Sequence, residues 1–259
     1  MGDARILDPP TRIGHMSAAP ELPPPHRILE VAIRDYPLWF PEERDRQVES
    51  AAFPDMVSLY RGLTSGYFPP PQATFADEVA RRVRGYPHSP VYARACRAYP
   101  SFVRQHHAVL ALSEHFPVVA WDRWLDQLQG VDVLVVDERG LAAGLDLSTD
   151  TATAREWHGV KEGRHPAAAI PVFEAYADPG EHRVGAFWLH DPKRLVAGVR
   201  AVLDQTILRA LAELEQDADD VYRRAERRPK CSRQDFDAGL RGALAFLKQR
   251  LLGGALKGS

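Results

Sequence analysis

The sequence contains very little cysteine: its 259 residues include only two, Cys96 and Cys231, which lie far apart in the chain. Two distant cysteines provide neither a disulfide framework nor the paired spacing of a zinc-binding cluster. The sequence also lacks any apolar run of about 18 residues, the length from which a membrane-spanning helix is predicted. No secretory signal is recognisable. We therefore expect a cytoplasmic protein in a reducing compartment, with no membrane partner.

Several catalytic signatures and any large charge excess are missing as well. The chain has no Gly-rich loop ending in Lys-Ser or Lys-Thr, no Gly-x-Ser-x-Gly elbow and no His-Glu-x-x-His, which argues against nucleotide-cofactor enzymes. Its 33 Lys and Arg residues nearly balance 35 Asp and Glu residues, for a formal net charge of −2. A uniformly basic surface is therefore excluded, while a local basic groove for nucleic acid is compatible with this charge.

Composition divides the chain into five segments. Residues 1–15 resemble an expression leader, because Gly-His-Met is a frequent cloning scar, and residues 16–26 form a Pro- and Ala-rich arm that we expect to lie outside any helix. Helix-like runs broken by prolines predict a helical N-terminal region over 27–99. A core over 100–215 and a C-terminal helical extension over 216–259 follow. Frequent Ala, Arg, Pro and Gly favours a bacterial source.

Short apolar, β-branched runs separated by charged or Gly-containing turns predict a sheet in the core. The strands are expected at 130–136, 141–149, 170–176 and 184–190. A helix that starts at Pro100 precedes them, and apolar residues at helical spacing predict another helix over 192–214.

Two of these strands each carry one carboxylate in apolar surroundings, Asp132 in the first and Asp146 in the second. Burying an unpaired charge is costly, so two carboxylates near one sheet edge indicate that a cation accompanies them. The pattern favours a metal site. The alternative for Asp132 is a side chain that caps a turn at the start of its strand.

Lys161 follows Asp146 after a segment that reads as a helix. A strand-borne Asp, a hairpin, a second strand-borne Asp and a downstream Lys resemble the PD-(D/E)XK nuclease superfamily, the fold of many restriction endonucleases and repair nucleases. The resemblance covers residues 100–191 and follows the αβββαβ order of that family. It implies an α/β fold: a central mixed β-sheet of restriction-endonuclease-like type, with a helical N-terminal region and C-terminal helices.

The sequence departs from the family pattern at two positions. Val131 stands where the family has proline, and Ser148 stands where the family has its lysine. Some members place the lysine on the following helix, and Lys161 would be that migrated residue. A solvated helix lysine is the alternative for Lys161.

The resemblance implies a metal-dependent nuclease that hydrolyses phosphodiester bonds in nucleic acid, with DNA as the expected substrate. Asp132, Asp146 and the main-chain carbonyl of Leu147 would hold Mg²⁺ or Mn²⁺. Lys161 would orient the attacking water or stabilise developing negative charge. A polar residue of the preceding helix would join the site, either Gln105 or Glu114.

Three side chains are candidates for contacts with nucleic acid: Gln105, Arg164 and His165. The basic stretch 223–233 is a further candidate, although the preceding acidic run would pair with it as a solvated helix face. His106 and His107 are neighbours on a helix and diverge by about 100°, which argues against a metal pair.

Two other functions are compatible with the sequence. The serine at the usual lysine position allows a catalytically inactive member of the same fold, which would serve as a nucleic-acid-binding or protein-assembly module. Alternatively, the helical region 27–99 is a platform for a protein partner or for a homodimer.

Overall fold

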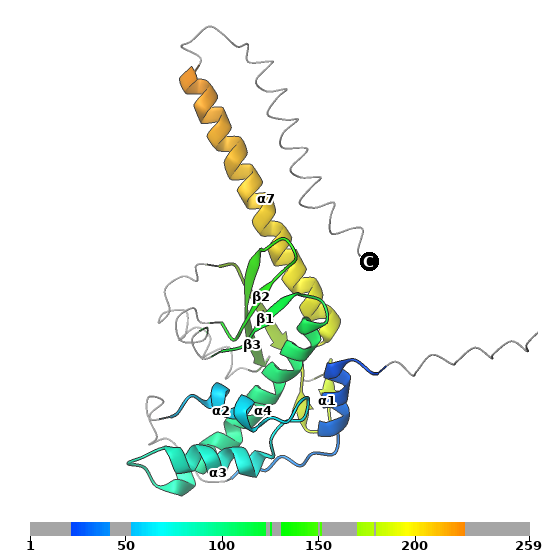
Figure 1. Ribbon diagram of the computed structural model, residues 1–259, viewed down its shortest axis with the longest axis vertical. Helices are drawn as coiled ribbons and strands as arrows, with labels where there is room; N and C mark the ends of the chain where they lie inside the picture. Colours follow the sequence, from blue (N-terminus) through cyan, green and yellow to red (C-terminus); the bar gives the residue numbers. More distant parts are fainter. Residues whose placement is uncertain are drawn as a thin grey trace, which may run out of the picture.

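The computed structural model describes residues 22–41, 53–122, 125, 131–149, 151, 170–178 and 180–225. These residues form five helices and a four-stranded mixed sheet (Figure 1), so the protein is of the α/β class. The helices are α1 (Pro25–Ile33), α2 (Met56–Leu63), α3 (Gln72–Arg82), α4 (His88–Ser113) and α7 (Pro192–Ala225). The strands are β1 (Val118–Ala120), β2 (Val133–Val136), β3 (Ala142–Thr149), β4 (Val172–Ala177), β5 (Arg183–Val184) and β6 (Phe187–Trp188).

The sheet has the order β1-β2-β3-β4, with the first three strands antiparallel and β4 parallel to β3. The β2–β3 hairpin closes where the sequence predicts a turn: Gly140 adopts φ +77, and Asp137 Oδ1 accepts hydrogen bonds from the amides of Arg139 and Leu141. The strands predicted at 130–136, 141–149 and 170–176 are confirmed as β2, β3 and β4.

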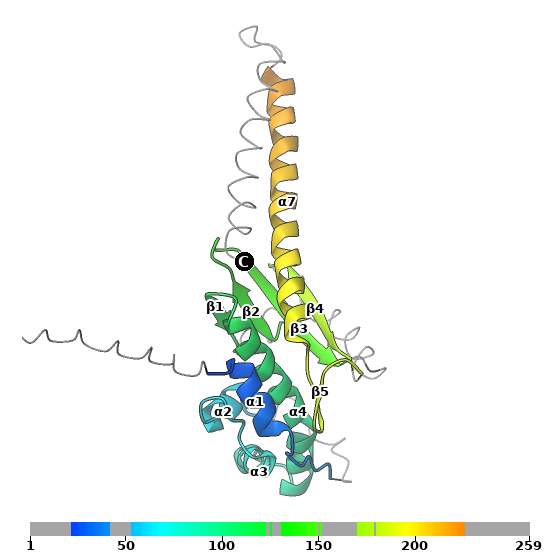
Figure 2. The ribbon, with the colours of Figure 1, turned by 90° about the vertical axis from the view of Figure 1, so that its right-hand side faces the viewer.

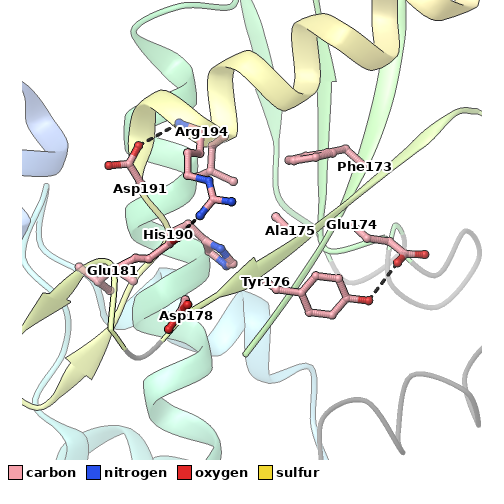
Figure 3. Close-up of a pocket in the computed structure, with 11 residues that line it drawn as sticks. Phe173, Glu174, Ala175, Tyr176, Asp178, Glu181, His190, Asp191 and Arg194 are labelled. Carbon is pink, nitrogen blue, oxygen red and sulfur yellow. Dashed lines mark hydrogen bonds and ion pairs between the residues drawn. The ribbon is translucent and has the colours of Figure 1, made fainter. Parts of the chain in front are cut away.

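Successive residues of each strand point to opposite faces of the sheet, as strand geometry requires. Leu145 pairs with Phe173 and Leu147 pairs with Ala175, and Gly198 of α7 lies directly against the Phe173 ring. Asp146 pairs with Glu174 in the same register. Figure 3 shows that Glu174 and Tyr176 point away from α7. The face that carries Asp146 is therefore opposite to the face covered by α7.

Helix α4 is the central helix of the fold and runs unbroken for 26 residues, through Pro100. The predicted break at Pro100 is wrong. A proline at this position cannot donate to the carbonyl of Cys96, one turn earlier. The side chain of Gln72, itself buried, donates to that carbonyl instead, at 2.9 Å. Because this replacement bond satisfies the carbonyl and both halves of α4 are buried, the helix continues.

The N-terminal helices share one hydrophobic core with the sheet. Tyr60 of α2 stacks on Phe102 of α4, and Phe75 of α3 packs edge-on against the same ring. Figure 2 shows α1, α2 and α3 packed around α4, with α1 on its second half, where Glu30 contacts His107. None of the described helices is long and apolar enough to cross a membrane.

Three further expectations from the sequence are wrong. Pro25, expected in an irregular arm, is the first residue of α1, a position where proline loses no helical hydrogen bond. The strand expected at 184–190 is a separate hairpin of β5 and β6, because Gly185 turns the chain with φ +57. Helix α7, expected to end at Leu214, continues to Ala225.

A glycine in α7 sets how closely that helix approaches β4. A Cβ atom added to Gly198 would overlap the Phe173 ring, whereas one added to Gly62 in α2 would meet nothing within 4 Å. We predict that Gly198→Ala lowers the free energy of unfolding by about 1–3 kcal/mol. Gly62→Ala should instead raise it by about 0.5–1 kcal/mol. Urea denaturation of both variants tests this, and equal effects would contradict the close packing of α7.

Candidate functional site

Asp132 immediately precedes β2, and its hydrogen bonds reach the two sequence neighbours of Asp146, the second predicted carboxylate. Its amide donates to the carbonyl of Leu145 at 2.7 Å, and its Oδ2 accepts from the amide of Leu147 at 2.7 Å. These two partners are the residues on either side of Asp146. The hairpin therefore places Asp132 level with Asp146 on the neighbouring strand.

Both carboxylates are buried, with exposed fractions of 9% for Asp132 and 7% for Asp146. Asp146 lies within β3, between strand neighbours on both sides, so the main chain that carries it is held by β2 and β4. The fold thus places the two acids that sequence analysis singled out on neighbouring strands.

Helix α4 contributes a third polar group to this site. Gln105 Nε2 donates to Asp132 Oδ1 at 2.9 Å, and Gln105 Oε1 accepts from Trp121 Nε1 at 3.1 Å. The amide is therefore held at both ends. Of the two helix residues considered, Gln105 contacts the predicted site, whereas Glu114 pairs with His26 at 2.6 Å.

A buried cation lies next to this group. Arg104 is 8% exposed, and its Nε donates to the carbonyl of Trp188 at 2.9 Å. Burial lowers the pKa of Arg104 to about 10, against the opposing charge of Asp132. The guanidinium is thus charged at neutral pH and offsets part of the negative charge of the acids.

A cavity of about 460 Å³ opens beside Arg104. Its lining includes Thr149, the last residue of β3, together with Arg183 and the aromatic residues Phe40 and Trp188. A cavity with two arginines and two aromatic rings suits an anionic ligand that carries flat rings.

A second cavity, of about 210 Å³, lies on the α7 side of β4 (Figure 3). Phe173 and Leu195 provide apolar walls, and His190 lies between them and the polar rim. Asp191 on this rim accepts a hydrogen bond from the amide of Arg194 at 2.9 Å, in the first turn of α7. Neither Asp132 nor Asp146 is among the described residues that line this cavity.

The remaining residues of the predicted site are only partly described by the structure. Lys161, Arg164 and His165 lie outside the described residues, as does most of the basic stretch 223–233. The amide of Leu147 contacts Asp132, and the metal-binding role of its carbonyl stays a prediction.

Sequence analysis missed a group formed by Glu30, His107 and His182. The three residues come from segments that are distant in sequence, and no spacing pattern links them. His106 and His107 indeed point to different partners: His106 stacks on Trp121, and His107 contacts Glu30.

Comparisons of the chain with known protein families, with curated proteins and with solved structures find no match.

The hydrogen bonds of Asp132 predict a stability effect. Asp132→Ala leaves the Leu147 amide and the Gln105 side chain without this acceptor, so it should lower the free energy of unfolding by about 1–3 kcal/mol. Asp132→Asn keeps one acceptor oxygen and should cost about half as much. The control is Asp178→Ala, which removes an exposed bond from the Gly180 amide. Urea denaturation that gives equal losses for Asp132→Ala and Asp178→Ala would contradict this role.

Buried histidines predict a loss of stability in acid. Burial, together with the nearby His107, lowers the pKa of His106 from 6.5 to about 4. Between these values the unfolded chain binds more protons, so the free energy of unfolding falls as the pH decreases. The loss at about pH 5 should be on the order of 2 kcal/mol for this residue.

His106→Phe retains a ring against Trp121 but cannot take up a proton. The variant should therefore lose less stability than the parent protein between about pH 7.5 and pH 5. Urea denaturation at both pH values measures this difference. Identical losses in the two proteins would show that His106 does not titrate in this window.

Proposed function

We propose that this protein is a metal-dependent nuclease that hydrolyses phosphodiester bonds, with DNA as its expected substrate. The observation that carries the proposal is a pair of hydrogen bonds that join Asp132 to Leu145 and Leu147, the residues on either side of Asp146. Two buried carboxylates at the same level of adjacent strands would provide oxygen ligands for a divalent cation.

The order of elements supports the same assignment. Helix α4 is followed by the antiparallel strands β1, β2 and β3, and then by β4 in parallel to β3. The first helix and the four strands follow the αβββαβ order expected from the resemblance to PD-(D/E)XK nucleases, and the helix expected between β3 and β4 lies outside the described residues. The polar residue from the preceding helix is Gln105, which contacts the first acid.

The donor set suits Mg²⁺ or Mn²⁺, which prefer oxygen ligands. A carboxylate oxygen has two lone pairs, so an oxygen that accepts one hydrogen bond still suits a metal. Asp132 and Asp146 would hold the ion, with the carbonyl of Leu147 as a further ligand. Such an ion lowers the pKa of bound water and neutralises charge on the phosphate.

Other side chains would position Asp132, the attacking water and the nucleic acid. Gln105 fixes the rotamer of Asp132, because it is itself held by Trp121. Lys161 would orient the attacking water or stabilise developing negative charge, as the resemblance implies. The cavity beside Arg104 would receive the nucleic acid, with its two arginines near phosphate and its aromatic rings against bases.

A non-catalytic binding module is the second candidate. It is favoured by the structural use of Asp132, whose two oxygens both accept hydrogen bonds within the fold. Ser148 at the usual lysine position agrees with it. Such a module would bind nucleic acid at the same face without cleaving it.

A cleavage assay tests the proposed activity. The full chain should cut plasmid, linear duplex or single-stranded DNA, or RNA, in the presence of Mg²⁺ or Mn²⁺ and not in the presence of EDTA. Asp146→Asn removes the charge and keeps the shape, and should lower the rate by at least about 100-fold, because even indirect partners of a metal contribute roughly 10- to 100-fold. Lys161→Ala should also lower the rate.

The matched control is Glu138→Gln, the same acid-to-amide change at an exposed position of the β2–β3 turn, which should leave the rate unchanged. Cleavage by Asp146→Asn at the parent rate would overturn the assigned site. Binding of DNA without cleavage under any condition would favour the second candidate.

A further inference from the structure

A second group of potential metal ligands lies where three segments meet. Glu30 belongs to α1, His107 to α4, and His182 to the turn before β5. Figures 1 and 2 show α1 and the hairpin of β5 and β6 beside α4. Glu30 Oε1 lies 3.0 Å from His107 Nε2 and 3.0 Å from His182 Nε2. The three ligand atoms all lie within 4.8 Å of one another.

Hydrogen bonds connect the three residues. Burial alone would raise the pKa of the Glu30 carboxyl, but hydrogen bonds from the two histidines and from Arg27 lower it to about 2.

Two of the three distances between the ligand atoms are close to those of a tetrahedral zinc site. Zinc–nitrogen distances of about 2.0–2.1 Å place neighbouring ligand atoms about 3.3 Å apart. The distances from Glu30 Oε1 to the two nitrogens are 3.0 Å, within a few tenths of an ångström of this value, and the two nitrogens lie within 4.8 Å of each other. Imidazole and carboxylate ligands suit zinc and related transition metals.

We propose that Glu30, His107 and His182 bind a zinc-class divalent ion, with one carboxylate oxygen and two Nε2 atoms as ligands and water in the fourth position. Each imidazole then carries its proton on Nδ1. The site is reached from solvent at His182, whose side chain is 17% exposed, whereas His107 is fully buried.

One further contact agrees with a metal at this position. Arg27 Nη1 donates to Glu30 Oε2 at 2.7 Å, which orients the carboxylate and leaves Oε1 directed at the histidines.

This site is independent of the proposed nuclease site. His107 and Gln105 are two residues apart on α4, so they point to nearly opposite sides of the helix. The ligands also differ in kind, because the nuclease site has oxygen ligands and this group has two nitrogens. The ion would fasten α1 and the hairpin of β5 and β6 to α4.

Metal titration of untagged full-length protein tests the proposal. After treatment with a chelator, calorimetry with Zn²⁺ should show one tight site per chain, and visible absorption with Co²⁺ should show a site with nitrogen and oxygen ligands. His182→Gln and Glu30→Gln should each weaken Zn²⁺ binding by at least about tenfold. The control His88→Gln alters an exposed histidine at the start of α4 and should bind as the parent does.

Circular dichroism establishes that each variant folds, and the partly exposed His182 is the position least expected to disturb folding. Unchanged Zn²⁺ binding in folded His182→Gln and Glu30→Gln, or no Zn²⁺ binding at micromolar concentration by the parent protein, would overturn the site and leave a hydrogen-bonded cluster only. Mg²⁺- or Mn²⁺-dependent cleavage by His182→Gln separates this outcome from failure of the nuclease proposal.

Discussion

The fold depends on the pairing of four consecutive polar residues in the middle of a buried helix. Arg104, Gln105, His106 and His107 point in different directions from α4, and burying any of them without a partner would be costly. Arg104 donates to the Trp188 carbonyl, Gln105 to Asp132, and His107 to Glu30, while His106 stacks on Trp121. These contacts attach the β6 hairpin, the sheet, α1 and the segment after β1 to the same turn of helix.

The same arrangement separates the two proposed sites. On one side of α4, Gln105 contacts the carboxylate of Asp132, next to β2, where we propose a hard cation. On the other side, His107 meets a carboxylate and a second imidazole, a setting for a zinc-class ion. Between them, His106 packs into the aromatic core with Tyr60 and Trp121. One helix thus supports two proposed sites with different ligand types.

Local patterns predicted the part of the fold that depends on local forces. Strands β2, β3 and β4 were predicted because β-branched runs alternate with turn residues, and Asp132 and Asp146 were singled out because they interrupt apolar strands. The continuity of α4 through Pro100 was not predictable, because it depends on Gln72, which lies 24 residues from the carbonyl that it satisfies. The group around Glu30 was missed for the same reason: its histidines are 77 and 152 residues away.

The central claim is that Asp132 and Asp146 hold a divalent cation, and a crystal structure with Mn²⁺ tests it most directly. Anomalous scattering locates Mn²⁺ independently of any assumed site. The account predicts a Mn²⁺ ion in contact with both carboxylates. Crystals saturated with Mn²⁺ that show no ion at these two residues would contradict it.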